Sequence, residues 1–376
     1  MVRIMHIGDV HLDSPFSCSD MRKSELRKVE LRTAFSSVLD KANAEKVDIV
    51  LISGDLFDSE NVTRETASFL QKKFAENNTC RFVISPGNHD PFTENSVYAK
   101  VRFPSNVYIF RSSHVSRICF DDLKTDIYGY AFEQSEMENV PFAGVSPVSP
   151  DRINILCAHG DMISEKSHTC PIRTYDIERS GFDYVALGHI HNGTEIKKAG
   201  ESFYAYCGCL EGRDFGECGE KGGILCSFEK KDGELQADFR RFDFSKRKYA
   251  IEKINVTGAK SSSDVLPLVK KTIEEKGYDQ KTLLRIVLEG EVSPDFVLGK
   301  TVFDSVSSDL FYFELVDKTR PFFDVGALKS DPTIRGAFYK ELLPYLESDD
   351  EKTREIGMKA LRYGLSSLAG NSIIEF

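Results

Sequence analysis

Short apolar runs that end abruptly in Gly, Asp, Asn or His recur along the N-terminal part of the chain. Each run is rich in Val and Ile and apolar at nearly every position, which predicts a strand buried on both faces of a sheet. The runs are Arg3–Ile7, Ile49–Ser53, Phe82–Ser85, Ile153–Ala158 and Tyr184–Leu187.

Helical patterns lie between several of these runs. Leu31, Phe35, Val38 and Ala42 recur at helical spacing, and so do Thr66, Leu70 and Phe74. Gly181 and Gly277 lie where a helix would stop. Strands that alternate with helices predict a layered α/β domain, whose functional site forms at the carboxyl ends of the strands.

The pattern changes after about Lys246. Strands are expected at 249–256, 283–288 and 309–316, and a helix is expected at 263–276 with Ser263 as its N-cap. These elements predict a small α+β domain that follows the core.

The last part of the chain predicts two amphipathic helices within 331–369, separated by the polar turn 348–350. The first carries Ile334, Phe338, Leu342 and Leu346, and the second carries Ile356, Ala360 or Leu361, Leu365 and Leu368. Their apolar faces are expected either to dock on the chain's own domain or to form a groove for a partner helix. The expected division is therefore a core at 1–245, a capping domain at 246–325 and a helical segment at 326–376.

Composition narrows the class of protein. Hydrophobic residues make up 41% of the chain, which excludes a wholly disordered protein. The net charge of −10 excludes a globally basic nucleic-acid coat, although a local patch could still bind phosphates. One such patch is interpreted either as a DNA contact or as a solvated edge strand. Its residues are Arg240, Arg241, Lys246, Arg247 and Lys248.

The cysteines and the apolar stretches bear on the compartment. Nine cysteines in 376 residues are too sparse for a disulfide scaffold, and reduced cysteines are typical of the cytoplasm. No stretch approaches the ~20 apolar residues of a membrane span, and the N-terminus is charged too soon for a signal peptide. A cytoplasmic protein without a membrane partner is expected.

Five polar clusters follow the predicted strands and contain five of the eight histidines. They are Asp9-Val10-His11, Gly54-Asp55-Leu56-Phe57-Asp58, Gly87-Asn88-His89-Asp90, His159-Gly160 and Gly188-His189-Ile190-His191. Any one of these histidines alone is better interpreted as a satisfied core or loop residue. Five clusters that each close an apolar strand favour a common site, and their glycines allow the tight turns that it needs.

Carboxylate, imidazole and amide groups together suit Mn, Fe or Zn and disfavour Ca, which prefers shells of oxygen alone. Two ions that share a bridging carboxylate would use all the candidate ligands and leave positions open for water and substrate. Such sites hold their ions about 3.5–4 Å apart and clamp both oxygens of an in-line phosphoryl displacement. The seven candidate ligands are Asp9, His11, Asp55, Asn88, His159, His189 and His191.

The ordered set DxH, GDxxD, GNHD, HG and GHxH resembles the calcineurin-like metallophosphoesterase superfamily from Ile4 to about His191. The resemblance implies a layered β-sandwich core flanked by helices and two divalent ions, with Mn expected and Fe or Zn as alternatives. It implies that His89 protonates the leaving oxygen and that Asp58 orients His89. It assigns the first metal to Asp9, His11, Asp55 and His191, and the second to the bridging Asp55 with Asn88, His159 and His189.

Two segments, Asp9–Phe16 and Gly212–Glu217, are similar to the SbcD/YhaO-like branch of DNA repair exonucleases. That likeness implies a hydrolase with exonuclease or endonuclease activity in DNA repair, and it makes Arg213 a further candidate DNA contact. It also implies terminal helices that bind an SMC-like coiled-coil ATPase, and it allows a homodimer. A phosphoesterase for nucleotides or other small phosphoesters is the alternative. A non-catalytic scaffold is disfavoured because all seven ligand positions are filled.

Overall fold

A computed structural model describes the chain except for residues 17–20, 232, 294–295, 323 and 369–376. The chain divides into two compact units, Met1–Tyr249 and Ala250–Phe376, and each is described by itself. Among the described residues, every helix is too short or too polar to cross a membrane.

The first sheet of the N-terminal unit has six strands in the order β12-β11-β1-β2-β3-β4. β1 to β4 run parallel to one another, whereas β11 pairs antiparallel with both β1 and β12. The strands are β1 (Val2–Ile7), β2 (Ile49–Ile52), β3 (Arg81–Ile84), β4 (Val107–Ile109), β11 (Gly222–Lys231) and β12 (Glu234–Asp243).

The second sheet also has six strands, in the order β5-β6-β7-β8-β10-β9. Its central strands β6, β7, β8 and β10 are parallel. The strands are β5 (Ser116–Phe120), β6 (Thr125–Gly129), β7 (Ile153–His159), β8 (Tyr184–Gly188), β9 (Lys197–Ala199) and β10 (Ser202–Tyr206). The helices of this unit are α1 (Met21–Ala44), α2 (Arg64–Glu76), α3 (Val97–Lys100) and α4 (Thr174–Glu178), with a 3-10 turn at Asp121–Leu123.

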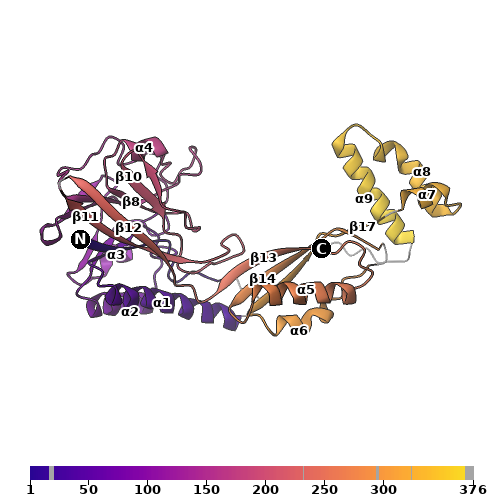
Figure 1. Ribbon diagram of the computed structural model, residues 1–376, viewed down its shortest axis with the longest axis horizontal. Coiled ribbons are helices and arrows are strands. Elements are labelled where there is room, and N and C mark those ends of the chain that lie inside the picture. The colour runs from indigo at the N-terminus through magenta and orange to yellow at the C-terminus, as the bar shows by residue number, and fades with distance from the viewer. Residues whose placement is uncertain (17–20, 232, 294–295, 323, 369–376) are drawn as a thin grey trace. The chain divides into compact units, whose positions relative to one another are not determined.

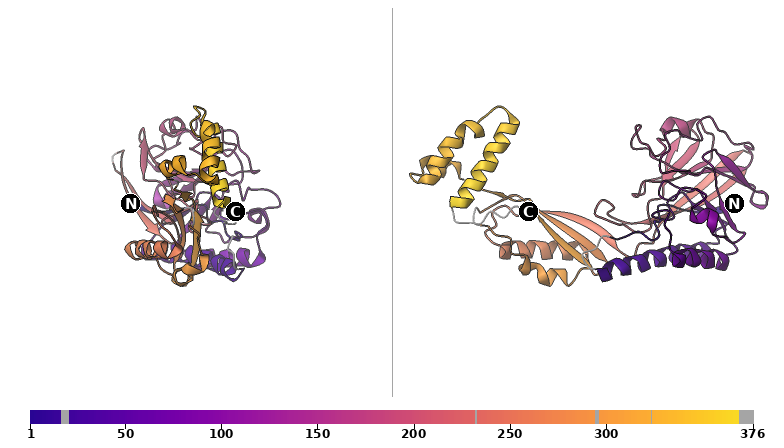
Figure 2. Two further views of the ribbon diagram at one scale, coloured as in Figure 1. Left: turned by 90° about the vertical axis from the view of Figure 1, so that its right-hand side faces the viewer. Right: turned by 180° about the vertical axis from the view of Figure 1, so that it is seen from behind.

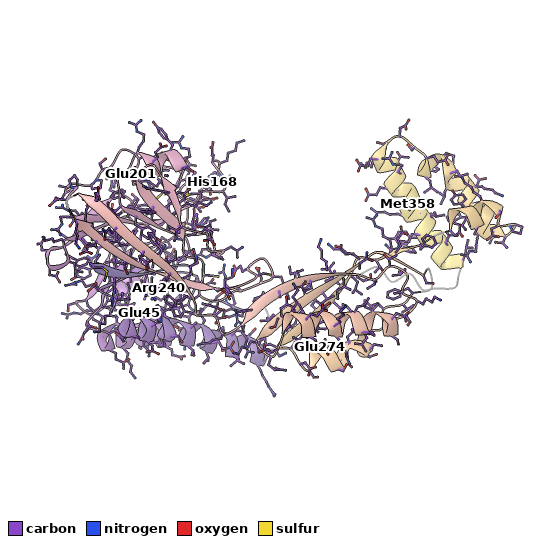
Figure 3. The ribbon with its side chains drawn as sticks, viewed as in Figure 1. Glu45, His168, Glu201, Arg240, Glu274 and Met358 are labelled. Carbon is purple, nitrogen blue, oxygen red and sulfur yellow. The ribbon has the colours of Figure 1, made fainter. Side chains whose placement is uncertain are left out.

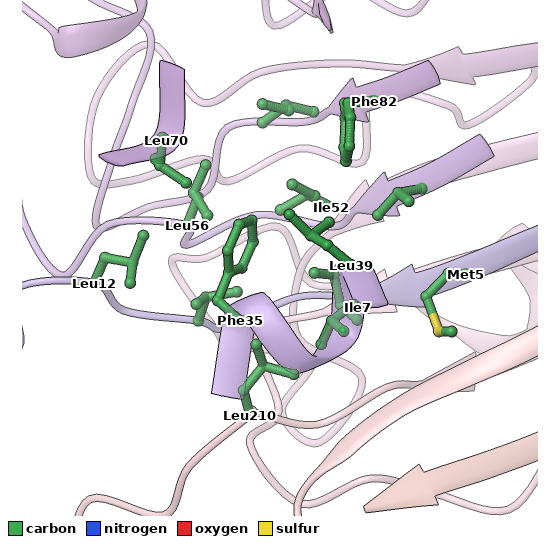
Figure 4. Close-up of a cluster of buried hydrophobic side chains, with 14 of the residues drawn as sticks. Met5, Ile7, Leu12, Phe35, Leu39, Ile52, Leu56, Leu70, Phe82 and Leu210 are labelled. Atoms are coloured by element: carbon green, nitrogen blue, oxygen red, sulfur yellow. The ribbon is translucent and has the colours of Figure 1, made fainter. Parts of the chain in front are cut away.

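Alternate residues of β1 enter different hydrophobic layers, because successive side chains of a strand point to opposite faces. Ile4 packs in the layer between the two sheets, with Cys157 and Ala186 of the second sheet. Met5 packs in the layer between the first sheet and α1 and α2, in the same cluster of buried side chains as Phe35 (Figure 4). The predicted β-sandwich flanked by helices is therefore confirmed (Figure 1).

His6 lies outside the predicted clusters and is a satisfied core residue. Its Nδ1 lies 2.9 Å from the hydroxyl of Tyr184 and its Nε2 lies 3.0 Å from the hydroxyl of Ser53. The imidazole is fully buried, and this burial, helped by the charge of Arg241, lowers the pKa of His6 to about 3. In the unfolded chain His6 has a pKa near 6.5 and is protonated below that pH. In the folded chain the imidazole stays neutral until the pH falls to about 3.

This proton linkage predicts that His6 supports the fold at neutral pH and loses that support as the pH falls from about 6.5 towards 3. Its contribution to the free energy of unfolding should fall by up to about 1.4 kcal/mol per pH unit in this window. Denaturant melts of His6→Gln between pH 7 and 4, in chelator, should show a shallower decline than wild type. Parallel stability curves would contradict the prediction.

The C-terminal unit contains a three-stranded sheet in the order β13-β14-β16. Its strands are β13 (Lys248–Asn255), β14 (Thr282–Glu289) and β16 (Tyr312–Asp317), and a small two-stranded sheet joins β15 (Glu291–Val292) to β17 (Arg320–Pro321). The helices are α5 (Ser262–Lys276) and α6 (Asp304–Ser307), with a 3-10 helix at Lys300–Phe303. The predicted α+β character of this region is confirmed.

The N-cap of α5 is Ser261 and not the predicted Ser263, and a capping box explains the difference. The hydroxyl of Ser261 and its backbone N–H both donate to the carboxylate of Asp264, which is the third residue of the helix. These two hydrogen bonds from Ser261 to Asp264 stabilise an earlier start than one serine alone would. Gly277 ends α5 with a φ of +65°, as predicted.

Three helices follow the α+β region: α7 (Val325–Ser330), α8 (Ile334–Leu346) and α9 (Glu351–Leu368). α8 and α9 lie side by side in both views of Figure 2. Much of the predicted apolar stripes is buried between them, because Phe338, Leu342 and Leu346 pack with Leu361 and Leu365. The end of the predicted segment, 369–376, lies outside the described residues.

Candidate metal centre

The predicted ligands lie at the carboxyl ends of parallel strands from both sheets. Asp9 follows β1, Asp55 follows β2 and Asn88 lies beyond β3 in the first sheet. His159 ends β7 and His189 follows β8 in the second. Because the two sheets pack face to face, turns that are distant in sequence meet at one edge of the sandwich.

The backbone at these turns is strained. Asp9, His11, Asp55 and His189 have φ values of +47°, +50°, +50° and +106°, a region that residues other than glycine rarely occupy. Close packing explains why the adjacent Gly188 is needed, because a Cβ there would lie 1.7 Å from the carbonyl oxygen of Ser53. Strain of this kind persists where the surrounding structure imposes it and is common at functional sites.

The first ligand group joins Asp9, His11 and His191, whose candidate ligand atoms all lie within 4.8 Å of one another. The Nε2 atoms of His11 and His191 are 3.1 Å apart. His11 and Asp9 are buried, and His191 is half-buried. Apart from Asp55, this group contains every residue assigned to the first metal.

The second ligand group converges on the side chain of Asn88. Its Oδ1 lies 2.9 Å from His159 Nε2 and 3.2 Å from His189 Nδ1. His159 also belongs to a buried group with Asp9 and Asp55. The structure therefore brings together all the residues assigned to the second metal.

Asp55 lies between the two groups. Its Oδ2 is 3.7 Å from His11 Nε2 and 3.5 Å from His159 Nε2. Its Oδ1 accepts a hydrogen bond of 3.0 Å from the backbone N–H of His89. One carboxylate oxygen thus lies near an imidazole nitrogen of each group, which is the position that a bridging ligand requires.

Proton positions at His159 show that the residues fit a cation. Its Nδ1 lies 2.9 Å from the carbonyl oxygen of Ser53, which can only accept, so Nδ1 carries the hydrogen. Its Nε2 then faces two acceptors, Asn88 Oδ1 and Asp55 Oδ2. In the metal-free chain a proton can fill this gap. Burial opposes that proton, but the carboxylates of Asp55 and Asp9 outweigh burial and raise the pKa of His159 to about 9.

His189 shows the opposite shift. Burial and the neighbouring His159 lower the pKa of His189 to about 4, so its imidazole is neutral and suited to bind a cation. The hydroxyl of Thr169 lies 3.1 Å from His189 Nε2, which leaves Nδ1 facing Asn88. A divalent cation at the point where these lone pairs meet would satisfy the group as a whole.

The predicted acid, His89, is exposed and lies beside the ligands. Its ring packs edge-on against His11, with centroids 4.9 Å apart. Asp58 contacts His89 through its backbone, because Nδ1 of His89 lies 3.1 Å from the carbonyl oxygen of Asp58. The carboxylate of Asp58 lies elsewhere, 2.9 Å from Arg213 Nη1 and 3.2 Å from His11 Nδ1.

Two carboxylates that support the site were not assigned by sequence. Asp90 accepts hydrogen bonds from the backbone of Gly87 at 2.8 Å and of Phe57 at 3.1 Å, and so ties two ligand turns together. Burial and the charge of Asp55 raise the pKa of Asp90 to about 7. Glu217 lies 2.5 Å from His191 Nδ1. The position of Asp90 directly after GNH was a usable signal, and for Glu217 the signal was the likeness of Gly212–Glu217 to the SbcD/YhaO-like branch, although it did not identify His191 as the partner.

The predicted DNA contacts are engaged within the N-terminal unit. Arg240 lies on the edge strand β12, and its Nη2 is 3.1 Å from Glu45 Oε2 (Figure 3). Arg213 pairs with Asp58 and Glu217 beside the site. The other four have partners too: Arg241 with the carbonyl oxygens of Tyr206 and Cys207, Lys246 with Ser37, Arg247 with Glu30, and Lys248 with Asp243.

Comparisons with known proteins agree with this geometry. A family model described as calcineurin-like phosphoesterase matches residues 2–193. The chain is 29% identical over 309 residues to the uncharacterized metallophosphoesterase YhaO of Bacillus subtilis (strain 168), an alignment that covers 78% of this chain and 73% of YhaO.

Two further similarities are more distant. The DNA double-strand break repair protein Mre11 of Saccharolobus solfataricus is 25% identical over 336 residues, which cover 85% of this chain and 83% of Mre11. The crystal structure of a dimetal phosphatase from Danio rerio matches 60% of this chain and 92% of its own, at 11% identity and a TM-score of 0.38. The chain thus belongs to the calcineurin-like metallophosphoesterase family, in its SbcD/Mre11-like branch.

Proposed function

We propose that the chain is a metal-dependent phosphodiesterase that cleaves DNA through a dinuclear centre. The position of Asp55 carries the proposal, because its Oδ2 lies 3.7 Å and 3.5 Å from the Nε2 atoms of His11 and His159. A carboxylate shared by two ligand groups is the arrangement that two-metal phosphoryl transfer uses.

The chain supplies two sets of ligands in this proposal. The first ion is held by Asp9, His11, Asp55 and His191, and the second by Asp55, Asn88, His159 and His189. Bound Mn²⁺, or Fe or Zn, would supply Lewis-acid stabilisation of the phosphate charge and a nucleophile at neutral pH.

His89 is proposed to protonate the leaving oxygen. Because its Nδ1 donates to the carbonyl of Asp58, Nε2 is the nitrogen free to face substrate. His89 must therefore carry two protons to act as an acid from Nε2. The backbone carbonyl of Asp58 accepts from the His89 ring, and the backbone N–H of His89 donates to the carboxylate of Asp55. The proposed acid and the proposed bridging carboxylate are therefore linked directly.

DNA is the proposed substrate, with exonuclease or endonuclease cleavage during repair. Support comes from the alignment with the repair protein Mre11 over 83% of that protein's length. The engagement of the basic patch in internal pairs suggests that the chain gains DNA affinity from a partner. The cytoplasm is the proposed location, which the free cysteines among the described residues support.

Hydrolysis of linear DNA and of bis-p-nitrophenyl phosphate, each with Mn²⁺ and with chelator, tests this proposal. We expect Mn²⁺-dependent cleavage of both substrates, lost in chelator. Cleavage of the small diester alone, with the partner present, would favour a phosphoesterase for nucleotides or other small phosphoesters. Metal-independent cleavage would contradict the dinuclear centre.

The hairpin of α8 and α9 is proposed to bind a coiled-coil ATPase. Ile356 and Tyr363 are seven residues apart on α9 and remain 57% and 37% exposed. This spacing places both on one face of the helix, as an apolar anchor for a partner helix requires. Among the residues that the structure describes, the hairpin's own apolar cluster is formed by α7, α8 and α9 alone.

A chain that ends at Phe322 is therefore expected to keep its metal sites and its activity on a small diester. Every proposed ligand precedes residue 192. Removal of all three helices removes every described residue of their apolar cluster, so none of its members is left exposed. The melting temperature of the N-terminal unit should be unchanged, while the ATPase should no longer be captured. Full-length Ile356→Glu should lose the ATPase too, with Lys352→Glu as the surface control. An ATPase that still binds both altered chains would contradict docking on this hairpin.

A further inference from the structure

His191 is supported by a chain segment that contributes no metal ligand of its own. The segment is 211–217, and Glu217 Oε1 lies 2.5 Å from His191 Nδ1. Glu217 is fixed in turn by Arg213, whose backbone N–H donates to Oε2 at 2.8 Å and whose Nη2 lies 3.3 Å from Oε1. The side chains of Arg213 and Glu217 are only 23% and 10% exposed.

The carboxylate of Glu217 determines which nitrogen of His191 carries hydrogen. An ionised carboxylate only accepts, so Nδ1 donates to it. Arg213 Nη2 lies 3.0 Å from the same Nδ1. Because both atoms are donors while Nδ1 donates to Glu217, this contact is not a hydrogen bond. Nε2 of His191 therefore presents a lone pair towards His11 Nε2, 3.1 Å away.

Arg213 also reaches the second imidazole of this group. Its Nη1 donates to Asp58 Oδ1 at 2.9 Å, and the same oxygen lies 3.2 Å from His11 Nδ1. One guanidinium thus positions the two carboxylates that lie behind the histidines of the first ligand group. Lysine has no planar fork with which to hold both carboxylates.

The segment is anchored where the chain leaves the N-terminal unit. The hydroxyl of Tyr249, the last residue of that unit, donates to the carbonyl oxygen of Arg213 at 2.9 Å. The ring of Tyr249 also packs edge-on against Phe215, with centroids 5.1 Å apart. At the other end, Glu211 forms a buried ion pair of 2.9 Å with Arg27 of α1.

The second ligand group has separate supports. His159 Nδ1 is held by the backbone of Ser53, and His189 Nε2 by the hydroxyl of Thr169. Neither support belongs to the segment 211–217. The two halves of the proposed centre therefore differ in what holds them.

We propose that Arg213 and Glu217 are positioning residues that set the affinity of the first metal subsite alone, and that Tyr249 sets their position. This inference rests on the proposed dinuclear function. It makes the first ion sensitive to the strand β13, which continues from Tyr249 into the C-terminal unit. The second ion would be insensitive to that strand.

Titration of Mn²⁺ into the full apoprotein, followed by calorimetry and by the EPR signal of a coupled Mn pair, tests the inference. Glu217→Gln should weaken one of the two ions by about 10–100-fold and leave the other unchanged, as expected for loss of a group that orients a ligand. Tyr249→Phe removes the hydroxyl that donates to the carbonyl oxygen of Arg213, and it should weaken the same ion by about fivefold.

The His191→Ala background separates positioning from general damage. Glu217→Gln should have no further effect on the ion that remains there, whereas Thr169→Val should still weaken it. If Glu217→Gln weakens the remaining ion, or weakens neither ion in the intact chain, the inference is overturned. Arg213→Lys should resemble Glu217→Gln, and full wild-type affinity in that variant would also overturn it.

The wild-type titration keeps the two proposals apart. A wild-type chain that binds two ions supports the dinuclear centre whatever Glu217→Gln does. A wild-type chain that binds one ion contradicts that centre and the inference with it, whereas a chain that binds two ions with no effect of Glu217→Gln contradicts the inference alone. Tyr249→Phe is the mildest change, and apoprotein melts establish that each variant is folded.

Discussion

Asp55→Asn is expected to damage metal binding more than any other single ligand change. The carboxylate is fully buried, and although burial disfavours its charge, His159 and His11 hold the pKa of Asp55 well below its usual range. An amide of the same shape cannot supply that charge to two ions. In an Mn²⁺ titration, both ions should be weakened by more than the ~10–100-fold that loss of a supporting group costs.

Asp126→Asn is the matched control, because Asp126 is equally buried and pairs with Arg117 and Arg152 on the second sheet. It should change stability without changing metal stoichiometry. If Asp55→Asn binds two ions as tightly as wild type, the bridge lies at another residue.

His89→Ala is expected to lower turnover by about 10²–10⁴-fold while both ions stay bound. The side chain is exposed beside the ligands, and the contact that supports Asp55 comes from the backbone N–H of His89, which alanine keeps. Single-turnover hydrolysis of a diester measures the rate, and metal analysis of the same sample measures the ions.

His89 also lies in a possible ligand group with His11 and Asp58, so metal analysis is decisive. A His89→Ala protein with fewer ions than wild type would make His89 a ligand and not an acid. A diester with a good leaving group gives a second test, since it needs no acid and should lose much less rate.

The parallel strands that carry the ligands could be predicted from sequence because they are buried on both faces. A continuous apolar run followed by Gly, Asp or His marks such a strand without any partner being known. β12 lacks that signal, and an edge strand was expected there only as one of two interpretations of the basic patch, whose Arg240 and Arg241 lie along β12 at the sheet edge. Edge strands carry such charges to block association, and their composition resembles that of a loop.

The ligand clusters could be found because each is local, whereas the supports of the site depend on tertiary contacts. His191 and Glu217 are 26 residues apart and meet only because the segment 211–217 returns beside β8. Asp58 was expected to orient His89, but the contact with His89 comes from its backbone carbonyl, while its carboxylate lies against His11 and Arg213. A sequence specifies residue types, but it does not say which atom of a residue makes the contact.

The distribution of the ligands over two sheets has a consequence for synthesis of the chain. Asp9 lies 180 residues before His189, whose backbone N–H donates to its carboxylate at 2.9 Å. β1, which carries Asp9, also needs β11 as its antiparallel neighbour, and β12 pairs with β11 in turn, so the first sheet is complete only after residue 243. A nascent chain on the ribosome therefore has no assembled reactive centre for most of its synthesis. The proposed hydrolytic chemistry can therefore begin only once both sheets of the N-terminal unit are formed, and a chain released before β11 would lack the proposed centre.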